Sequence, residues 1–172
     1  MKRLLSIIGA ISLLVGTNTT SLVACNNIVE YIPDELAKLK AENKIKTNNQ
    51  EIRDNLEWIA PQEKPFNNVD NKYYYVVWRG DKNDNWRIVN FKNNQQDKLK
   101  NKDKYDKYKL ALVQDLDWHS IFDLTIQKGN LTWIFWHNDN QHFKYVYRWN
   151  GDEKKLPNLV VYNDDNVKVK GE

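Results

Sequence analysis

The chain has 172 residues, with 26 Lys and Arg, 23 Asp and Glu and a single cysteine. This near balance of charge argues against a dedicated nucleic-acid binder, which needs a concentrated basic face, and one cysteine excludes an internal disulfide. Seven Trp, nine Tyr and five Phe exclude a chain that is disordered throughout, because disordered chains are poor in aromatic residues.

The chain begins with the features of an exported precursor. Lys2 and Arg3 precede an apolar run, LLSIIGAISLLVG, which is shorter than the roughly 20 residues that span a bilayer. A polar stretch, TNTTS, then leads to Leu22-Val23-Ala24-Cys25. A charged start, a short apolar run and a small residue before the cut are typical of a secretory signal peptide. We therefore predict a signal peptide at residues 1–24, with cleavage between Ala24 and Cys25.

Cys25 stands where bacterial lipoprotein precursors carry their modified cysteine, at the end of a lipobox. Its sulfur is predicted to receive a diacylglyceryl lipid, and no other cofactor is expected. Two acyl chains hold a protein stably at a membrane, so we expect a lipid-anchored protein at the extracellular face of the cell membrane. A nucleophilic, metal-binding, disulfide-forming or simply buried Cys25 would leave the leader in front of it unexplained.

The leader, MKRLLSIIGAISLLVGTNTTSLVACN, closely resembles those of mollicute surface lipoproteins, the spiroplasma type in particular. The resemblance covers about the first 27 residues. It implies a cell with one membrane and no wall, so that the mature domain faces the surroundings. It implies no particular activity, because such leaders precede many unrelated domains.

Removal of the leader would leave 148 residues (172 − 24), enough for one domain. Residues 25–50 are predicted to form the lipid anchor and a polar spacer with a helix that begins at Pro33, where proline and the acids after it favour a helix start. A second helix is predicted over residues 51–60, packed on a β-rich domain that spans residues 51–172. Ile45, Ile52, Leu56 and Ile59 also fit a heptad, which leaves a short coiled coil as the alternative.

From residue 72 the pattern changes to aromatic and β-branched runs, which favour strands. KYYYVVWRG and WRIVNF predict a hairpin, and the charged stretch 92–107 predicts a long solvated loop. Five more strands are predicted at residues 108–114, 121–127, 131–137, 142–149 and 158–163, and a short one at 167–171. Lys128-Gly129 and Asn150-Gly151 are both expected to form hairpin turns.

This series predicts a mainly β fold, an antiparallel meander or sandwich preceded by one or two short helices. Several strands are apolar on both faces, as in Tyr73–Trp78. One face must form the core, and the other must be covered by the helix containing Ile52 and Ile59, by a second sheet or by a ligand.

Two short motifs coincide at the first predicted hairpin. Arg79-Gly80-Asp81 matches the integrin-recognition tripeptide, although Gly-Asp is also ordinary turn sequence. Asp81, Asn83 and Asn85 have the spacing of a calcium loop, but Trp86 and Lys92 stand where that loop needs Gly and Glu. A turn explains these residues better.

Carboxylates and imidazoles gather in two segments, QDLDWHSIFD and WHNDNQHF. They contain Asp115, Asp117, His119, Asp123, His137, Asp139 and His142. The two segments could build a metal or hydrolytic site if they met. Nothing in the spacing requires this, and His137 and His142 are expected to flank an exposed turn. We therefore predict no metal site and no catalytic residues.

The density of aromatic residues suggests a binding surface, because Trp and Tyr on an exposed strand stack on sugars or anchor partners. The predicted patch contains Trp86, Trp136, Trp149, Arg79 and Asp81. The sequence thus favours a surface binding, adhesion or coat module without catalytic activity, with a host or environmental macromolecule as partner and no nucleic acid. A lipoprotein that captures a sugar or peptide for a transporter, and a surface metal-dependent hydrolase or nuclease, are the alternatives.

Overall fold

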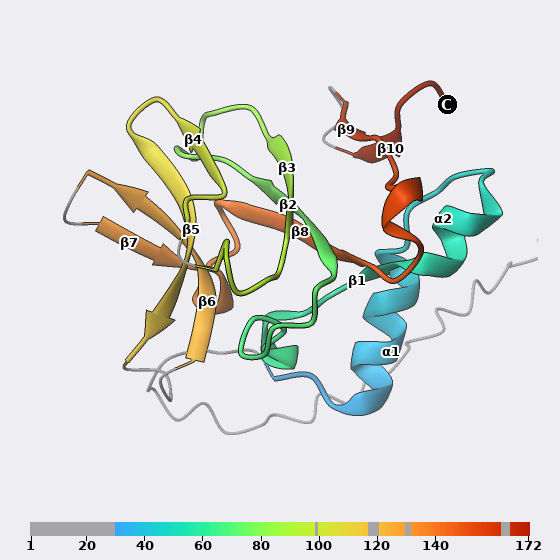
Figure 1. The fold of residues 1–172 in the computed structure, drawn as a ribbon, viewed down its shortest axis with the longest axis horizontal. Coiled ribbons are helices and arrows are strands. Elements are labelled where there is room, and N and C mark those ends of the chain that lie inside the picture. Colours follow the sequence, from blue (N-terminus) through green and yellow to red (C-terminus); the bar gives the residue numbers. More distant parts are fainter. Residues whose placement is uncertain (1–29, 99, 117–120, 130–131, 163–165) are drawn as a thin grey trace, which may run out of the picture.

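The computed structural model describes residues 30–172 except 99, 117–120, 130–131 and 163–165. The predicted signal peptide, Ala24 and Cys25 lie outside the described residues, as do Asp117 and His119. The described chain forms two short helices and three antiparallel sheets (Figure 1). The predicted mainly β, antiparallel fold is therefore confirmed.

Two helices open the described chain. The first, α1 (Pro33–Glu42), begins at the predicted proline, and the Glu35 carboxylate accepts a hydrogen bond from the Ile32 N–H at 3.3 Å. The second, α2 (Gln50–Asn55), is capped by Asn49, whose side chain accepts from the Ile52 N–H. Such caps satisfy the free N–H groups of a helix start.

The α1 region lies against the domain instead of standing off as a spacer. The backbone of Tyr31 exchanges two hydrogen bonds with the Gln62 side chain, at 2.7 and 2.9 Å. The Lys40 ammonium bridges the carboxylates of Glu57 and Glu63 at 2.5 and 2.6 Å. Tyr31 and Lys40, which lie within the predicted spacer 25–50, thus contact the β-rich domain.

The helix predicted over residues 51–60 ends at Asn55. The chain continues as strand β1 (Leu56–Trp58), which pairs antiparallel with β8 (Phe143–Trp149). Short apolar runs suit a helix and a strand equally well. A strand forms here because it satisfies the backbone groups along the edge of β8 and still buries Leu56.

The first sheet has the order β1-β8-β2-β3, with β2 (Tyr73–Trp78) and β3 (Arg87–Lys92) forming the predicted hairpin. The second sheet contains β4 (Asp103–Tyr105), β5 (Tyr108–Asp115), β6 (Ile121–Lys128) and β7 (Thr132–Phe135) in sequence order. Strand β4 lies inside the stretch 92–107 predicted as a solvated loop. That part of the prediction is wrong, because β5 offers an unpaired edge and Trp78 Nε1–H donates to Asp103.

The prediction of a hairpin turn at Asn150-Gly151 is also wrong. Strand β8 lies between β1 and β2, so both of its edges are occupied. The chain instead enters a 3₁₀ turn at Glu153–Lys155, and β9 (Leu159–Val161) pairs with β10 (Val167–Val169) in a separate C-terminal ribbon. By contrast, Gly129 does join β6 and β7, with a φ of 60° that suits glycine.

Two further 3₁₀ turns complete the described chain. Pro61–Glu63 follows β1, and Trp136–Asn138 follows β7, which therefore ends two residues before the predicted His137.

The first sheet is covered on both faces, and its strands alternate between two cores. The inner core lies between the two sheets and includes Tyr74, Val76, Trp78, Leu110, Leu124 and Ile126. The outer core lies on the opposite face and includes Tyr75, Val77, Tyr147 and Trp149, with Ile52 from α2 and Leu159 and Val167 from the ribbon. Figure 1 shows the second sheet on one side of the first, and the helices and ribbon on the other. The domain is thus a sandwich with an extra, smaller cover.

The four residues that fit a heptad are all buried within this domain. Ile45, Ile52 and Leu56 lie in the outer core, and Ile59 lies in the inner core. The structure therefore accounts for their spacing without a coiled coil.

Candidate ligand site

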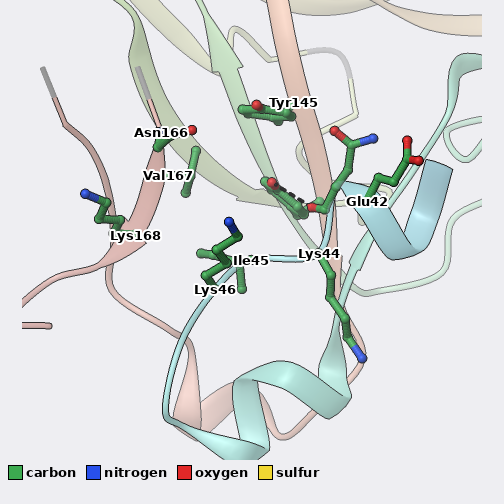
Figure 2. Close-up of a pocket in the computed structure, with 10 residues that line it drawn as sticks. Glu42, Lys44, Ile45, Lys46, Tyr145, Asn166, Val167 and Lys168 are labelled. Carbon is green, nitrogen blue, oxygen red and sulfur yellow. Dashed lines mark hydrogen bonds between the residues drawn. The ribbon is translucent and has the colours of Figure 1, made fainter. Parts of the chain in front are cut away.

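A pocket of about 260 Å³ opens on the outer side of the first sheet, where the segment that joins α1 to α2 crosses β8 and β10 (Figure 2). We call it the tyrosine pocket. It exists because the helices and the ribbon are too small to cover the whole outer face. Three segments that are distant in sequence therefore leave a hollow where they meet.

Strand β8 supplies the aromatic wall. Tyr145 and Tyr147 are two residues apart, so they point to the same face of the sheet. Their ring centroids are 5.8 Å apart and their planes are inclined by 34°. The Tyr147 hydroxyl donates to the Asn43 carbonyl at 3.2 Å. Burial, and then the charge of Tyr145, raises the pKa of Tyr147, so this hydroxyl stays protonated.

The apolar part of the lining comes from the other two segments. Ile45 lies between the helices and Val167 lies on β10, and both are buried against the tyrosines. These contacts fix the α1–α2 connection in place. The pocket lining is thus held in place without a ligand.

The polar lining consists of Glu42, two amides and lysines. Figure 2 shows the Lys46 ammonium directed into the pocket, whereas the ammonium groups of Lys44 and Lys168 point away from it. Lys46 forms no ion pair within the part of the chain that the structure describes. The Asn43 side chain donates to the Leu39 carbonyl at 2.9 Å, which holds the end of α1 beside the pocket.

This arrangement is suited to binding. Aromatic rings pack against the C–H face of a ligand, and a cation with amides beside it orients polar groups. The Glu42 carboxylate of the same lining pairs with Lys38 at 3.8 Å, so the Lys46 ammonium can attract an anionic group on that ligand. The sequence does not predict this pocket, although the alternation in KYVYRW places Tyr145 and Tyr147 on one face.

The predicted exposed patch of Trp86, Trp136 and Trp149 is wrong for two of its three indoles. Trp136 is 7% exposed and lies in the inner core, and Trp149 is 1% exposed and lies in the outer core. The Trp149 indole N–H donates to the Asp152 carbonyl at 2.9 Å, so the polar atom of the ring is satisfied in the core. Large apolar rings contribute more to stability when they are packed than when they are displayed.

Trp86 remains half-buried at the start of β3, and cations surround it. The Arg79 guanidinium lies 4.2 Å from the ring centroid, and the Lys144 ammonium lies 5.5 Å from it. The Arg79 Nε–H also donates to the Gln141 carbonyl at 2.7 Å. Trp86 and Arg79, two members of the predicted patch, thus lie in contact with each other.

Arg79-Gly80-Asp81 is not displayed as a free loop tip. Gly80 is buried, and a Cβ at this position would lie 2.2 Å from Cδ2 of Tyr108. Asp81 accepts from the Asn83 N–H at 3.2 Å, which lowers the pKa of its carboxyl, and its own N–H donates to Asp84. These are turn contacts, and they use the Asp81 carboxylate, which would be the first ligand of a calcium loop.

Part of the predicted His and Asp cluster does come together. His137 Nδ1 lies 2.8 Å from the Asp123 carboxylate, which also accepts from the backbone N–H of His137 at 3.0 Å. His137 Nε2 lies 3.7 Å from the Asp115 carboxylate. All three side chains are buried, so the expectation that His137 is exposed is wrong. Burial raises the pKa of Asp123, with the contacts to His137 opposing it.

His142 contacts a different carboxylate. Its Nδ1 lies 2.8 Å from Asp139, three residues earlier, within one turn of the chain. Among the residues that the structure describes, no group of three or more His, Cys, Asp or Glu is arranged to hold a metal ion.

The sequence is similar to a viral protein of unknown function. Over 117 residues, 67% of this chain, the sequence is 25% identical to the "Uncharacterized protein ORF1" of Spiroplasma virus SpV1-R8A2 B. The chain spans 11% of the length of that protein. No family model and no solved structure matches the chain. The similarity links this sequence to a spiroplasma-related origin.

Among the described residues, no helix is long and apolar enough to cross a membrane.

Proposed function

We propose that this protein is a surface lipoprotein, anchored through Cys25, whose β domain binds a sugar ring in the tyrosine pocket. The proposal concerns binding and not catalysis. The observation that carries it is the pocket itself, in which two tyrosine rings, the Lys46 ammonium and amide side chains line one hollow.

The size and chemistry of the pocket favour a single small ring. Pockets for drug-sized ligands measure about 300–1,000 Å³, and this one is slightly smaller at about 260 Å³. A sugar has an apolar C–H face that suits Tyr145 and Tyr147, and hydroxyl groups at its rim that suit Asn43, Asn166 and Glu42. Lys46 would select a ring that carries an acidic group.

The leader supports the anchor. The sequence before Cys25 has the charge, apolar length and lipobox of a lipoprotein precursor. Helix α1 begins eight residues after Cys25. Eight extended residues reach at most about 29 Å, so an anchored domain would remain close to the membrane surface.

Calorimetric titration with methyl glycosides tests the pocket. We expect glucuronic acid methyl glycoside to bind more tightly than the neutral glucose methyl glycoside. Tyr145→Ala should weaken the acidic sugar at least ten-fold by removing a stacking surface, and Lys46→Gln should abolish the preference for it. Lys44→Gln is the matched control, because it removes a charge from the same segment but from a side chain that points away.

The sugar proposal fails if neither glycoside binds, or if Lys44→Gln and Lys46→Gln have the same effect. Either result would mean that the pocket does not select the ligand.

Detergent phase partitioning tests the anchor. The native protein should enter the detergent phase with a lipid on Cys25, identified by mass spectrometry of the mature N-terminus, and Cys25→Ser should remain in the aqueous phase. A native protein that stays aqueous with an unmodified cysteine would remove this part of the proposal.

A further inference from the structure

The aromatic lining of the tyrosine pocket continues beyond it across the outer face of the first sheet. From the pocket outward, Tyr145 is followed by Lys144, whose ammonium lies 5.7 Å from the Tyr145 centroid and 5.5 Å from that of Trp86. Arg79 then covers Trp86 at 4.2 Å. We call Tyr145, Lys144, Trp86 and Arg79 the basic strip.

A β-bulge creates this strip. Val77 pairs with Tyr145 and the next residue, Trp78, pairs with Phe143, so Lys144 is an extra residue on β8. Extra residues of this kind redirect a side chain from its regular position. Lys144 would otherwise follow the strict alternation of the strand, and the bulge lets its ammonium reach the rings of the outer face.

The strip lies at the end of the outer face that α2 and the ribbon leave partly open. Its four side chains are half-buried, whereas Tyr75 and Trp149 at the other end of the same strands are fully buried. The strip therefore combines a firmly packed base with accessible polar ends. Such preorganised side chains lose little freedom when a ligand binds.

The charge of this surface is positive. Arg79 uses Nε–H for the Gln141 carbonyl and makes no ion pair with a carboxylate of the described chain. Lys46 in the pocket is likewise without an ion pair there. A long ligand that enters the pocket and follows the strip would meet a cation at both ends and a third in between.

We propose that the basic strip and the tyrosine pocket together bind an acidic polysaccharide, with one ring in the pocket and successive acid-bearing rings along the strip. This inference rests on the proposed sugar-binding function. Aromatic rings and cations in alternation match a chain whose sugar rings alternate with carboxylates or sulfates. Arg79 can also contact an anionic group with two N–H groups at once.

A single-stranded nucleic acid also stacks on aromatic rings, but it carries a charge at every nucleotide and needs a denser basic track. The strip offers two cations, and the whole sequence has a net charge of +3. The observations therefore favour the polysaccharide.

Titration with oligosaccharides of increasing length tests this inference on the full mature chain. The probes are hyaluronan fragments of two, four and eight sugars, neutral chitin fragments of the same lengths, and an oligothymidylate of ten nucleotides. We expect the hyaluronan affinity to rise at least ten-fold from two to eight sugars, with no such rise for chitin. Arg79→Gln and Trp86→Ala should each remove most of that rise and leave binding of the disaccharide unchanged.

Two controls match these variants. Lys82→Gln removes an exposed charge from the same β2–β3 turn, and Trp133→Ala removes an exposed indole from the second sheet. Both should leave the length dependence unchanged, and circular dichroism verifies that each variant is folded.

Three other outcomes would overturn this inference. Disaccharide binding with no dependence on length or on Arg79 would overturn the strip and leave the pocket function standing. Tighter binding of oligothymidylate than of the octasaccharide would overturn the inference in favour of nucleic acid. No binding of any sugar would overturn both proposals.

Discussion

The two faces of the first sheet differ in how they are covered, although the same strands build both. The inner face packs against a complete second sheet, and its residues Tyr74, Val76 and Trp78 are fully buried. The outer face packs against one short helix, a connecting segment and a two-stranded ribbon. A complete cover gives stability, whereas an incomplete cover leaves the tyrosine pocket and the basic strip.

The chemistry of the two faces follows this difference. The outer tyrosines hold irregular backbone through their hydroxyls, since Tyr75 donates to the Pro157 carbonyl at 2.8 Å and Tyr147 donates to that of Asn43. Carbonyls in such segments lack strand partners and would otherwise be unsatisfied. Tyrosine hydroxyls on the outer face thus hold the irregular segments that cover it.

The inner core gives the largest expected effect. Trp78→Ala should reduce the free energy of unfolding by about 3–5 kcal/mol, because it removes a fully buried indole and leaves a cavity. Urea denaturation measures this loss. The control Trp133→Ala, at a 47% exposed side chain, should change it by less than about 0.5 kcal/mol. Similar losses for both variants would contradict the inner core described above.

The edge of the inner core gives the next effect. Gly80→Ala should cost about 1–3 kcal/mol, because the new Cβ would meet the ring of Tyr108 at 2.2 Å. Lys82→Ala in the same turn should be neutral, since that side chain is exposed. Chemical denaturation of both variants tests the prediction, and a neutral Gly80→Ala would show that the close approach is absent.

The outer core gives a smaller effect that depends on pH. Tyr75→Phe should cost about 1 kcal/mol at neutral pH through loss of its hydrogen bond to Pro157. Burial raises the pKa of Tyr75 to about 12, above the value of about 10 for an unfolded chain. Its stabilising contribution is therefore complete below pH 10 and is lost as the pH rises through 12.

Alkaline denaturation should consequently be less steep in Tyr75→Phe than in the wild type. A slope remains, because burial also raises the pKa of Tyr74 and Tyr147. Tyr162→Phe, at an exposed ring, should keep the wild-type slope. An unchanged slope in Tyr75→Phe would mean that this hydroxyl is not buried.

An exposed ion pair between α2 and the 3₁₀ turn at Glu153–Lys155 gives the smallest expected effect on stability. Lys155 and Glu51 form an ion pair at 3.1 Å, with side chains that are 61% and 40% exposed. Exposed pairs contribute about 0–1 kcal/mol and are screened by salt. A double-mutant cycle with Lys155→Ala and Glu51→Ala should give a coupling below about 0.5 kcal/mol that vanishes in 1 M NaCl. A larger coupling would show that this ion pair contributes substantially to the stability of the fold.

The sequence predicts the strands well because their side chains are rich in aromatic and β-branched residues, throughout Tyr73–Trp78 and at half of the positions of Ile121–Lys128. Its errors occur where tertiary pairing decides. Leu56–Trp58 continues a helical pattern but completes the edge of β8, and Asp103–Tyr105 lies in a polar run but pairs with β5. Asn150-Gly151 has hairpin residues, but both edges of β8 are already occupied.

The site was less predictable than the fold. A single sequence does not show which face of an aromatic strand is left uncovered, so it places Trp136 and Trp149 at the surface and does not distinguish Tyr145 from the other aromatic residues. Lys46 belongs to a polar stretch that resembles any solvated linker. The bulge that redirects Lys144 has no local sequence signal. The meeting of Asp123 with His137 depends on β6 lying beside β7.

The double hydrogen bond between Tyr31 and Gln62 has a mechanical consequence. A protein held by a lipid at its N-terminus is pulled from that end whenever its ligand is attached to another body. If Cys25 carries the proposed lipid, such force would load this contact first among the described residues and the Lys40 bridges to Glu57 and Glu63 next, before the sheets. Release of the α1 segment would then lengthen the connection to the lipid while the sandwich, with the proposed binding surface on β8, remained folded.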